Sequence, residues 1–230
     1  MERERALSEL KSRFVSMASH EFRTPLSALL SSAALAQQYL ERGEASKTIK
    51  HIEKIKASVK NLNDILNDFL SLDKLEQGGV QMSITRFDLR EFAEGICEEM
   101  ENFIKPGQDI SMSFDGPVDI DQDQHILRNV LINLLSNASK YSGEEKIQLV
   151  VAATPDSVSI RVIDKGIGIP EHQQQHIFGR FFRADNTSNI QGTGLGLNIV
   201  KRYVELMKGS IAFKSELGVG TTFHIELPRA

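Results

Sequence analysis

The chain has 230 residues, 40% of them hydrophobic, so it is long enough to bury a core and to form one large domain or two small ones. It carries 27 Lys and Arg against 31 Asp and Glu, without the basic excess that is typical of nucleic-acid-binding proteins. No apolar run approaches the roughly eighteen residues that a membrane-spanning helix needs. We therefore expect this segment to contact neither nucleic acid nor a membrane.

Cysteine use and the first residues bear on location. Cys97 is the only cysteine in the sequence, which excludes an internal disulfide framework and favours a reducing compartment. The start, MERERALSELK, lacks the apolar stretch of a signal peptide and reads as the continuation of a charged helix. We expect a cytoplasmic chain, or the cytoplasmic part of a membrane-bound sensor whose sensor or membrane region lies upstream.

The first third of the sequence has a helical period. Apolar residues recur three and four apart from Leu7 to Ala33 and again from Ile49 to Phe69, with the polar turn ERGEAS between them. This pattern predicts two long amphipathic helices joined as a hairpin. Because a lone hairpin leaves much of its apolar stripe exposed, whereas two copies close a four-helix bundle, we expect a homodimer.

After Gly79 the pattern changes to short alternating runs separated by Gly, Pro and Asp, with helical patterns between them. The expected strands are 110–116, 147–154, 157–164, 209–215 and 221–228, and the expected helices are 89–103, 123–141 and 194–207. The order favours an α+β fold in which a mixed sheet is covered on one face by helices. We therefore predict two domains, residues 1–78 and 79–230.

A first glycine cluster, VIDKGIGIP, follows a predicted strand and contains Asp164, Gly166 and Gly168. A carboxylate at a strand end can accept a hydrogen bond from an exocyclic amine, and glycines let the chain approach a flat ring closely. This arrangement is one way to hold adenine.

A second cluster lies directly before an apolar helix and comprises Gly192, Thr193, Gly194, Leu195 and Gly196. Free backbone N–H groups and the dipole at a helix N-terminus favour an anion such as phosphate. On its own, the cluster is as typical of an ordinary turn and helix cap as of a phosphate site.

The predicted helix 123–141 carries Asn133 and Asn137 on one face, with Lys140 and Tyr141 a turn further on. Amide oxygens can hold a Mg²⁺ that also binds phosphate oxygens and water. Lys140 would add positive charge near the phosphates, and Tyr141 an aromatic surface for the base. Taken alone, the two asparagines are more typical of a solvated helix face.

Five segments in order resemble the H, N, first glycine, F and second glycine boxes of sensor histidine kinases: SHEFRTPL, NLLSNASKY, DKGIGIP, IFGRFFR and GTGLGLNIV. They extend from His20 to about Lys201. The resemblance implies a dimerising helical hairpin that carries the phosphoacceptor, followed by the Bergerat-type α/β sandwich that also binds ATP in gyrase and MutL.

The resemblance assigns roles to the H box. His20 is the expected nucleophile toward the γ-phosphorus of ATP and has to face solvent. Glu21 would accept or orient the proton on the other ring nitrogen. Thr24 would position water when the partner protein is dephosphorylated. Pro25 removes one helical hydrogen bond, so the helix can bend there.

The resemblance also implies ATP with Mg²⁺ as the cofactors, the metal being held by Asn137 and Asn133. Residues 177–191 would form a mobile lid, in which Arg183 points at the γ-phosphate. The phosphoryl group would pass from the histidine to an aspartate on the receiver domain of a response regulator, and the same protein could act as that regulator's phosphatase.

Two other functions stay open. Hydrolytic ATPases of this fold place a Glu four residues before the metal-binding Asn to activate water, whereas this chain has Asn133, which cannot act as a general base. Transfer is therefore favoured over hydrolysis. A non-catalytic scaffold that binds a receiver domain is the third possibility. Among the other histidines, His172 and His176 fit a polar surface helix, and His224 stands alone.

Overall fold

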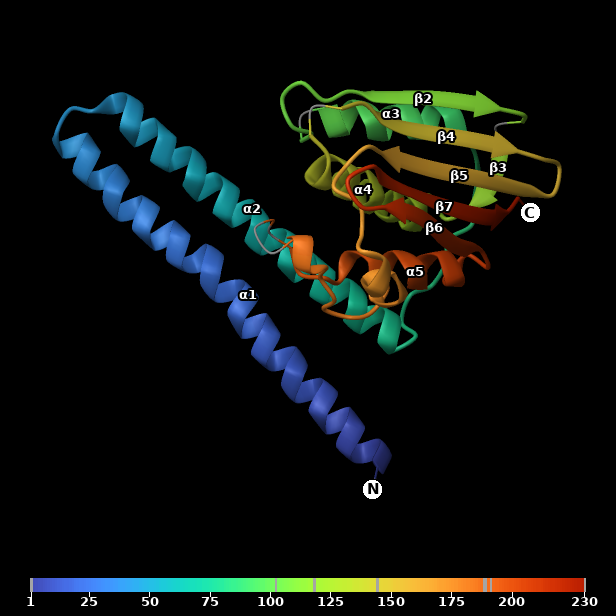
Figure 1. The fold of residues 1–230 in the computed structure, drawn as a ribbon, viewed down its shortest axis with the longest axis horizontal. Helices are drawn as coiled ribbons and strands as arrows, with labels where there is room; N and C mark the ends of the chain where they lie inside the picture. Colours follow the sequence, from blue (N-terminus) through green and yellow to red (C-terminus); the bar gives the residue numbers. More distant parts are fainter. Residues whose placement is uncertain are drawn as a thin grey trace. The chain divides into compact units, whose positions relative to one another are not determined.

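The computed structural model describes residues 2–229 except 102, 118, 144, 188, 189 and 191, and it leaves out the side chains of 2–18 and 20. The chain folds as two compact units, Met1–Asp73 and Lys74–Ala230. Two long helices, α1 (Glu2–Glu41) and α2 (Ala45–Glu76), form the predicted hairpin (Figure 1). No helix in the described part of the chain is long and apolar enough to span a membrane.

The hairpin is closed by a glycine turn and by ring contacts between its two helices. Gly43 adopts a φ of +72°, which a residue with a Cβ rarely tolerates, and its N–H donates to the carbonyl of Leu40 at 3.0 Å. The rings of Phe22 and Phe69 stack at 5.9 Å between centroids, so distant parts of the sequence face each other. α1 continues through Pro25, the position where a bend was considered.

Large apolar side chains remain exposed along both helices of the hairpin. They are Leu26, Leu30, Leu35, Leu40, Ile49, Ile52, Val59, Leu66 and Leu70, with Leu30 at 69% and Leu40 at 67% exposure. A stripe of this kind is unusual on an isolated surface and typical of a surface that another protein covers.

The second unit contains a five-stranded mixed sheet in the order β2-β4-β5-β7-β6 (Figure 1). Its strands are β2 (Ile110–Asp115), β4 (Ile147–Ala153), β5 (Ser157–Asp164), β6 (Ser210–Glu216) and β7 (Gly220–Pro228). β2 pairs parallel with β4, and the other neighbours are antiparallel. Two short strands, β1 (Thr85–Asp88) and β3 (Asp119–Gln122), form a separate antiparallel pair that the sequence pattern did not predict.

Three helices lie on one face of the large sheet: α3 (Leu89–Glu101), α4 (Gln124–Tyr141) and α5 (Gly196–Leu206) (Figure 1). Every second residue of the central strands is buried beneath them, as the alternation predicts. The most deeply buried large side chains of this core include Leu127, Leu131, Leu134, Leu135, Ile147, Leu149 and Ile160. The predicted α+β class, with a mixed sheet and helices on one face, is confirmed.

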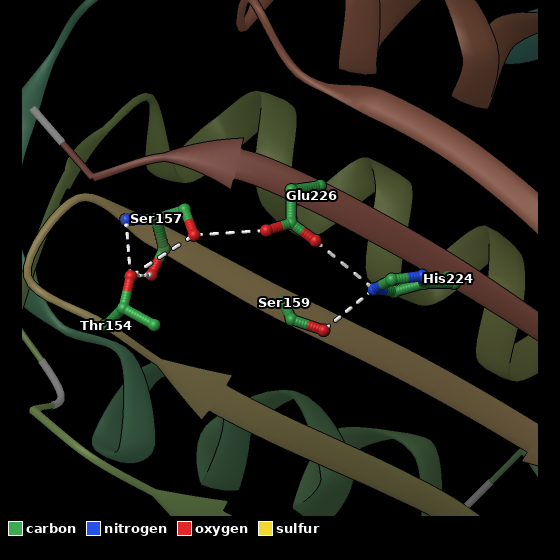
Figure 2. Close-up of polar contacts among 5 residues, drawn as sticks. All are labelled: Thr154, Ser157, Ser159, His224 and Glu226. Atoms are coloured by element: carbon green, nitrogen blue, oxygen red, sulfur yellow. Dashed lines mark hydrogen bonds and ion pairs between the residues drawn. The ribbon is translucent and has the colours of Figure 1, made fainter.

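The opposite face of the sheet is polar. Figure 2 shows Ser157 and Ser159 of β5, His224 and Glu226 of β7, and Thr154 of the turn before β5 joined by hydrogen bonds and an ion pair. The four strand residues alternate with buried apolar ones, so they point away from the helices. The nucleotide-site candidates lie elsewhere, after β5, along α4 and at the start of α5.

Candidate nucleotide-binding site

Asp164, the last residue of β5, is only 8% exposed. Its Oδ1 atom accepts hydrogen bonds from the N–H groups of Gly166 at 2.8 Å and Thr221 at 3.2 Å. Burial raises the pKa of this carboxyl above its ordinary value, although the two backbone donors act in the opposite direction. Because both donors bind Oδ1, Oδ2 is the oxygen suited to the amine of a ligand.

The first glycine cluster packs too closely for side chains. A Cβ atom at Gly166 would lie 2.5 Å from the carbonyl oxygen of Tyr141, and one at Gly168 would lie 2.0 Å from that of Glu216. Gly168 also has a φ of +64°. Packing within the protein therefore requires glycine at both positions, and their predicted role in the close approach of a flat ring stays a prediction.

α4 carries the two asparagines, and its start is capped by Asp123, whose Oδ1 accepts from the N–H of Ile126 at 2.9 Å. Asn133 and Asn137 are half-buried on this helix. A Cβ atom at Gly196 would lie 2.4 Å from Oδ1 of Asn133, so α4 meets the second glycine cluster at this point.

Lys140 and Tyr141 reach the same cluster one turn later. A Cβ atom at Gly192 would lie 3.0 Å from Nζ of Lys140 and 3.9 Å from the hydroxyl of Tyr141. Burial raises the pKa of Tyr141, an effect that nearby Arg183 partly offsets. The ring of Tyr141 is thus available as a neutral aromatic surface at neutral pH.

The second cluster is shaped by the chain before it. Gly194 has a φ of +70°, and a Cβ atom there would lie 2.7 Å from the carbonyl carbon of Phe181. Leu195 is fully buried, and its N–H donates to Oγ1 of Thr193 at 3.2 Å. The cluster therefore opens α5 while its backbone stays close to the segment that was predicted to be a lid.

The donor set suits a metal that is shared with a nucleotide. Among the described residues, no group of three or more His, Cys, Asp or Glu side chains could hold a metal by itself. Asn133 and Asn137 offer neutral amide oxygens on one face of α4, which fits Mg²⁺ bound together with phosphate oxygens and water.

Two family models match the chain. Residues 10–78 match the His Kinase A (phospho-acceptor) domain. Residues 122–230 match the histidine kinase-, DNA gyrase B-, and HSP90-like ATPase. The catalytic domain of histidine kinase ThkA is 30% identical in a solved structure with a TM-score of 0.57, over 64% of this chain and 97% of that one. The chain belongs to the sensor histidine kinases.

Curated relatives agree with this assignment. Hybrid signal transduction histidine kinase B of Dictyostelium discoideum is 35% identical over 97% of this chain and 12% of its own length. Sensor histidine kinase RcsC of Escherichia coli K12 is 33% identical over 96% of this chain and 24% of its own. The chain thus spans a quarter or less of these relatives. The solved complex of ThkA with response regulator protein TrrA has the same fold at 23% identity, with a TM-score of 0.70 over 100% of this chain and 64% of that one.

The segment that was predicted to be a lid is anchored to the domain by Phe178. Phe178 contacts Phe213 of β6 at 5.8 Å between ring centroids, and its carbonyl accepts from Nδ2 of Asn198 at 2.7 Å. Arg183 donates from Nη2 to the carbonyls of Thr187, at 2.8 Å, and Ile190. The guanidinium therefore braces the lid backbone, and its role at a γ-phosphate stays a prediction.

The sequence pattern did not predict the two hydrogen bonds between Gln173 and Asp185, which we call the latch. Gln173, which is 8% exposed, donates from Nε2 to Oδ2 of Asp185 at 2.5 Å, and its Oε1 accepts from the N–H of Asp185 at 3.0 Å. Nδ2 of Asn186 donates to the carbonyl of Gly168 at 2.9 Å. The only available signal was the polar run EHQQQH, which forms a 3₁₀-helix over Glu171–His176.

The H box lies in α1, as predicted. The side chain of His20 falls outside the described residues, so its expected exposure stays a prediction. Thr24 is exposed and Glu21 is half-buried on the same helix. Both residues take part in interactions within the protein.

His224 belongs to no motif in the sequence, but in the structure it has polar neighbours on two strands. Its Nε2 atom lies 2.8 Å from Oγ of Ser159 and 3.3 Å from Oε2 of Glu226 (Figure 2). A hydrolytic triad needs the serine and the carboxylate on opposite ring nitrogens. Because both partners meet the same nitrogen here, the cluster lacks the geometry of a nucleophilic site.

Proposed function

We propose that this chain is an ATP-dependent protein-histidine kinase core that phosphorylates itself on His20. The observation that carries the proposal is the meeting of the N-box helix with both glycine clusters. The side chain of Asn133 lies beside Gly196, Nζ of Lys140 lies beside Gly192, and the carbonyl of Tyr141 lies beside Gly166, each where a Cβ atom on the glycine would meet it. These contacts support one continuous surface that can hold base, sugar-phosphate and metal together.

In the proposed reaction, a neutral ring nitrogen of His20 attacks the γ-phosphorus of ATP. An N–P bond forms while the bond to the oxygen bridging the β- and γ-phosphates breaks, and ADP leaves. The proton on the other ring nitrogen stays there, hydrogen-bonded to Glu21. The adjacent carboxylate therefore favours the tautomer that attacks and stabilises the charge on the ring.

The nucleotide residues hold the substrate in place, because phosphoryl transfer depends mainly on positioning and charge neutralisation. Asp164 would accept the adenine amine through Oδ2. Lys140 would lie near the phosphates, and Arg183 would meet the γ-phosphate if the lid closes. Mg²⁺, held by Asn137 and Asn133, would neutralise charge on the phosphate oxygens.

The acceptor after His20 is proposed to be an aspartate on the receiver domain of a response regulator, with Thr24 guiding water in the reverse, phosphatase reaction. ThkA, whose catalytic domain is 30% identical to this chain, was solved in complex with a response regulator. ATP and receiver domains are cytoplasmic, which supports a cytoplasmic location for this segment.

We also propose that the hairpin dimerises. The exposed apolar stripe on α1 and α2 supports this, because a second copy would cover it in a four-helix bundle. Leu30, at 69% exposure, is suited to the test. Leu30→Glu should shift the mass in sedimentation equilibrium from dimer toward monomer, whereas Gln38→Glu at an exposed polar position should not. An unchanged mass for Leu30→Glu would contradict this interface.

Product analysis separates the kinase from the hydrolytic alternative. The purified chain is incubated with γ-labelled ATP and Mg²⁺, and protein-bound label, ADP and inorganic phosphate are quantified over time. The kinase predicts label on protein in step with ADP during the first turnover, because Asn133 cannot serve as the general base for water. Sustained release of inorganic phosphate without labelled protein would overturn the proposal in favour of hydrolysis, and no nucleotide binding would favour a scaffold.

A further inference from the structure

The last turn of α4 carries Lys140 and Tyr141, and the helix ends at Tyr141 with Ser142 as its C-cap. An α-helix leaves its last four carbonyl groups without intrahelical partners, and other donors must satisfy them if the end is to stay ordered. The carbonyl of Tyr141 accepts from the N–H of Ile167 at 3.1 Å, which ties this helix end to the first glycine cluster.

Lys105 satisfies two further carbonyls. Its Nζ atom donates to the carbonyl oxygen of Lys140 at 2.9 Å and to that of Ser142 at 2.7 Å. An ammonium group at this place also complements the negative end of the helix dipole. One cation from a distant part of the sequence therefore holds the backbone on both sides of Tyr141.

Gln108 binds the same helix end from a second direction. Its Nε2 atom donates to the carbonyls of Ser139 at 3.0 Å and Gly143 at 2.5 Å, and its Oε1 atom accepts from Oγ of Ser139 at 2.6 Å. The amide thus has both its donor and its acceptor sides occupied by the end of α4 and the residues that follow it.

The segment that carries both side chains is preorganised. In the turn Lys105–Gln108, the N–H of Gln108 donates to the carbonyl of Lys105 at 3.1 Å, and Gly107 has a φ of +87°. A type II turn requires positive φ at its third position, where this turn has Gly107, and proline is common at its second position, where this turn has Pro106. Oε1 of Gln108 also accepts from the backbone N–H of Lys105 at 3.0 Å, which fixes the Gln108 side chain against the backbone of the turn.

We propose that Lys105 and Gln108, together the 105–108 clamp, are positioning residues for the nucleotide. They hold the last turn of α4 so that Nζ of Lys140 and the ring of Tyr141 face the Gly192 loop. Neither clamp residue needs to touch ATP, because each acts through the backbone of α4. The inference rests on the proposed function, since it assumes that Lys140 and Tyr141 bind the nucleotide.

Lys105→Met removes the donors while keeping the length of the apolar stem, and Lys105 is exposed, so the substitution buries no new group. Lys146→Met is the matched control, because Lys146 is an exposed lysine whose partner is Asp109 at 3.5 Å on the same side of the domain. Lys105→Arg keeps charged N–H donors. Gln108→Glu keeps the acceptor bonds and removes the donors, and it provides a second test if Lys105→Met fails to fold.

Affinity for a fluorescent ATP analogue with Mg²⁺ and the kcat and KM of autophosphorylation are measured on the whole 230-residue chain. Lys105→Met and Gln108→Glu are expected to weaken binding about three- to tenfold, which corresponds to losing part of one charge-assisted contact. The KM for ATP should rise in parallel, with kcat within about twofold because no reacting group changes. Lys105→Arg and Lys146→Met should stay within about twofold of the unaltered chain in both quantities.

Different results would overturn the 105–108 clamp and the proposed function. If the unaltered chain binds nucleotide and Lys105→Met binds equally well, the clamp is overturned and the proposed function stands. A fall in kcat at unchanged KM, or an equal loss in Lys146→Met, also overturns the clamp. If the unaltered chain binds no nucleotide, the proposed function itself fails.

Discussion

Gly196 and Asn133 are in contact: a Cβ atom added at Gly196 would lie 2.4 Å from Oδ1 of the asparagine amide. The two residues belong to different motifs, the second glycine cluster and the N box, and they join α5 to α4. Packing within the protein therefore requires a glycine here, and the approach of a phosphate to it stays a prediction.

Gly196→Ala is expected to displace Asn133 and weaken nucleotide binding at least about tenfold, with a loss of about 1–3 kcal/mol in unfolding free energy from overpacking. Gly95→Ala in α3 is the control, because a Cβ atom there meets nothing within 4 Å. That control should be neutral or slightly stabilising, since alanine favours a helix. Nucleotide titration and urea unfolding check both variants. Unchanged nucleotide affinity in Gly196→Ala would contradict this prediction, because it would show that displacing Asn133 does not affect binding.

The charge of the Asp164 carboxylate is expected to lower the stability of the fold and to favour nucleotide binding. Its pKa is raised by burial, so the folded state takes up the proton before the unfolded chain does as the pH falls. The ionised carboxylate therefore opposes folding above the raised pKa, and this opposition fades as the pH falls through that pKa toward the ordinary value of 3.8.

Asp164→Asn keeps an oxygen for the N–H groups of Gly166 and Thr221 but removes the charge. We expect the variant to melt at a higher temperature than the unaltered chain at pH 7.5 without nucleotide, and the difference to shrink as the pH is lowered. Adenine nucleotide affinity should fall at least about tenfold, the scale of a lost charge-assisted hydrogen bond. A variant that melts lower at neutral pH, or a difference independent of pH, would contradict this account.

Asn137 provides a test of the metal. Asn137→Ala should weaken nucleotide binding in the presence of Mg²⁺, while in EDTA the variant and the unaltered chain should bind alike. Asn129→Ala is the matched control on α4, where the amide contacts His125 at 3.3 Å. A loss that persists in EDTA would mean that Asn137 contacts the nucleotide or supports the fold. Loss of the dimer would likewise remove the metal role.

The hydrogen bonds of Gln173 to Asp185 are expected to restrain the segment that was predicted to be a lid. Gln173→Ala removes two hydrogen bonds to Asp185, so it should cost about 1–2 kcal/mol of local stability and loosen the chain around Arg180 and Arg183. Limited trypsin digestion without nucleotide should then cut there faster, whereas Gln175→Ala, at an exposed position of the same short helix, should be cut at the original rate. Equal rates for both variants would show that the latch does not restrain the lid.

The longer helices and strands could be predicted from the sequence because burial of one face sets the spacing of their apolar residues. β5 coincides with the expected residues 157–164, and α4 begins one residue after the expected start of its helix. By contrast, β1 and β3 have four residues each and no clear alternation, so no periodic signal was available. Their pairing became visible only in the structure.

The motifs of the candidate site could be predicted from the sequence, but the contacts between residues far apart in the sequence could not. Lys105 meets the carbonyl of Lys140 across 35 residues of sequence, and Ser159 meets His224 across 65. From the sequence, the segment KPGQ predicts only a turn. Its lysine and glutamine bind the end of α4, which is far away in the sequence and close only in the folded domain. Such long-range partners depend on strand pairing and helix docking, which no local pattern specifies.

The most direct test concerns the phosphoacceptor. The unaltered chain, His20→Gln and the control His51→Gln are each incubated with γ-labelled ATP and Mg²⁺, and the bound label is tested in acid and in alkali. The account predicts an acid-labile, alkali-stable label on the unaltered chain and on His51→Gln, and none on His20→Gln. Label of the same kind on His20→Gln would contradict it, because the phosphoryl group would then reside on another residue.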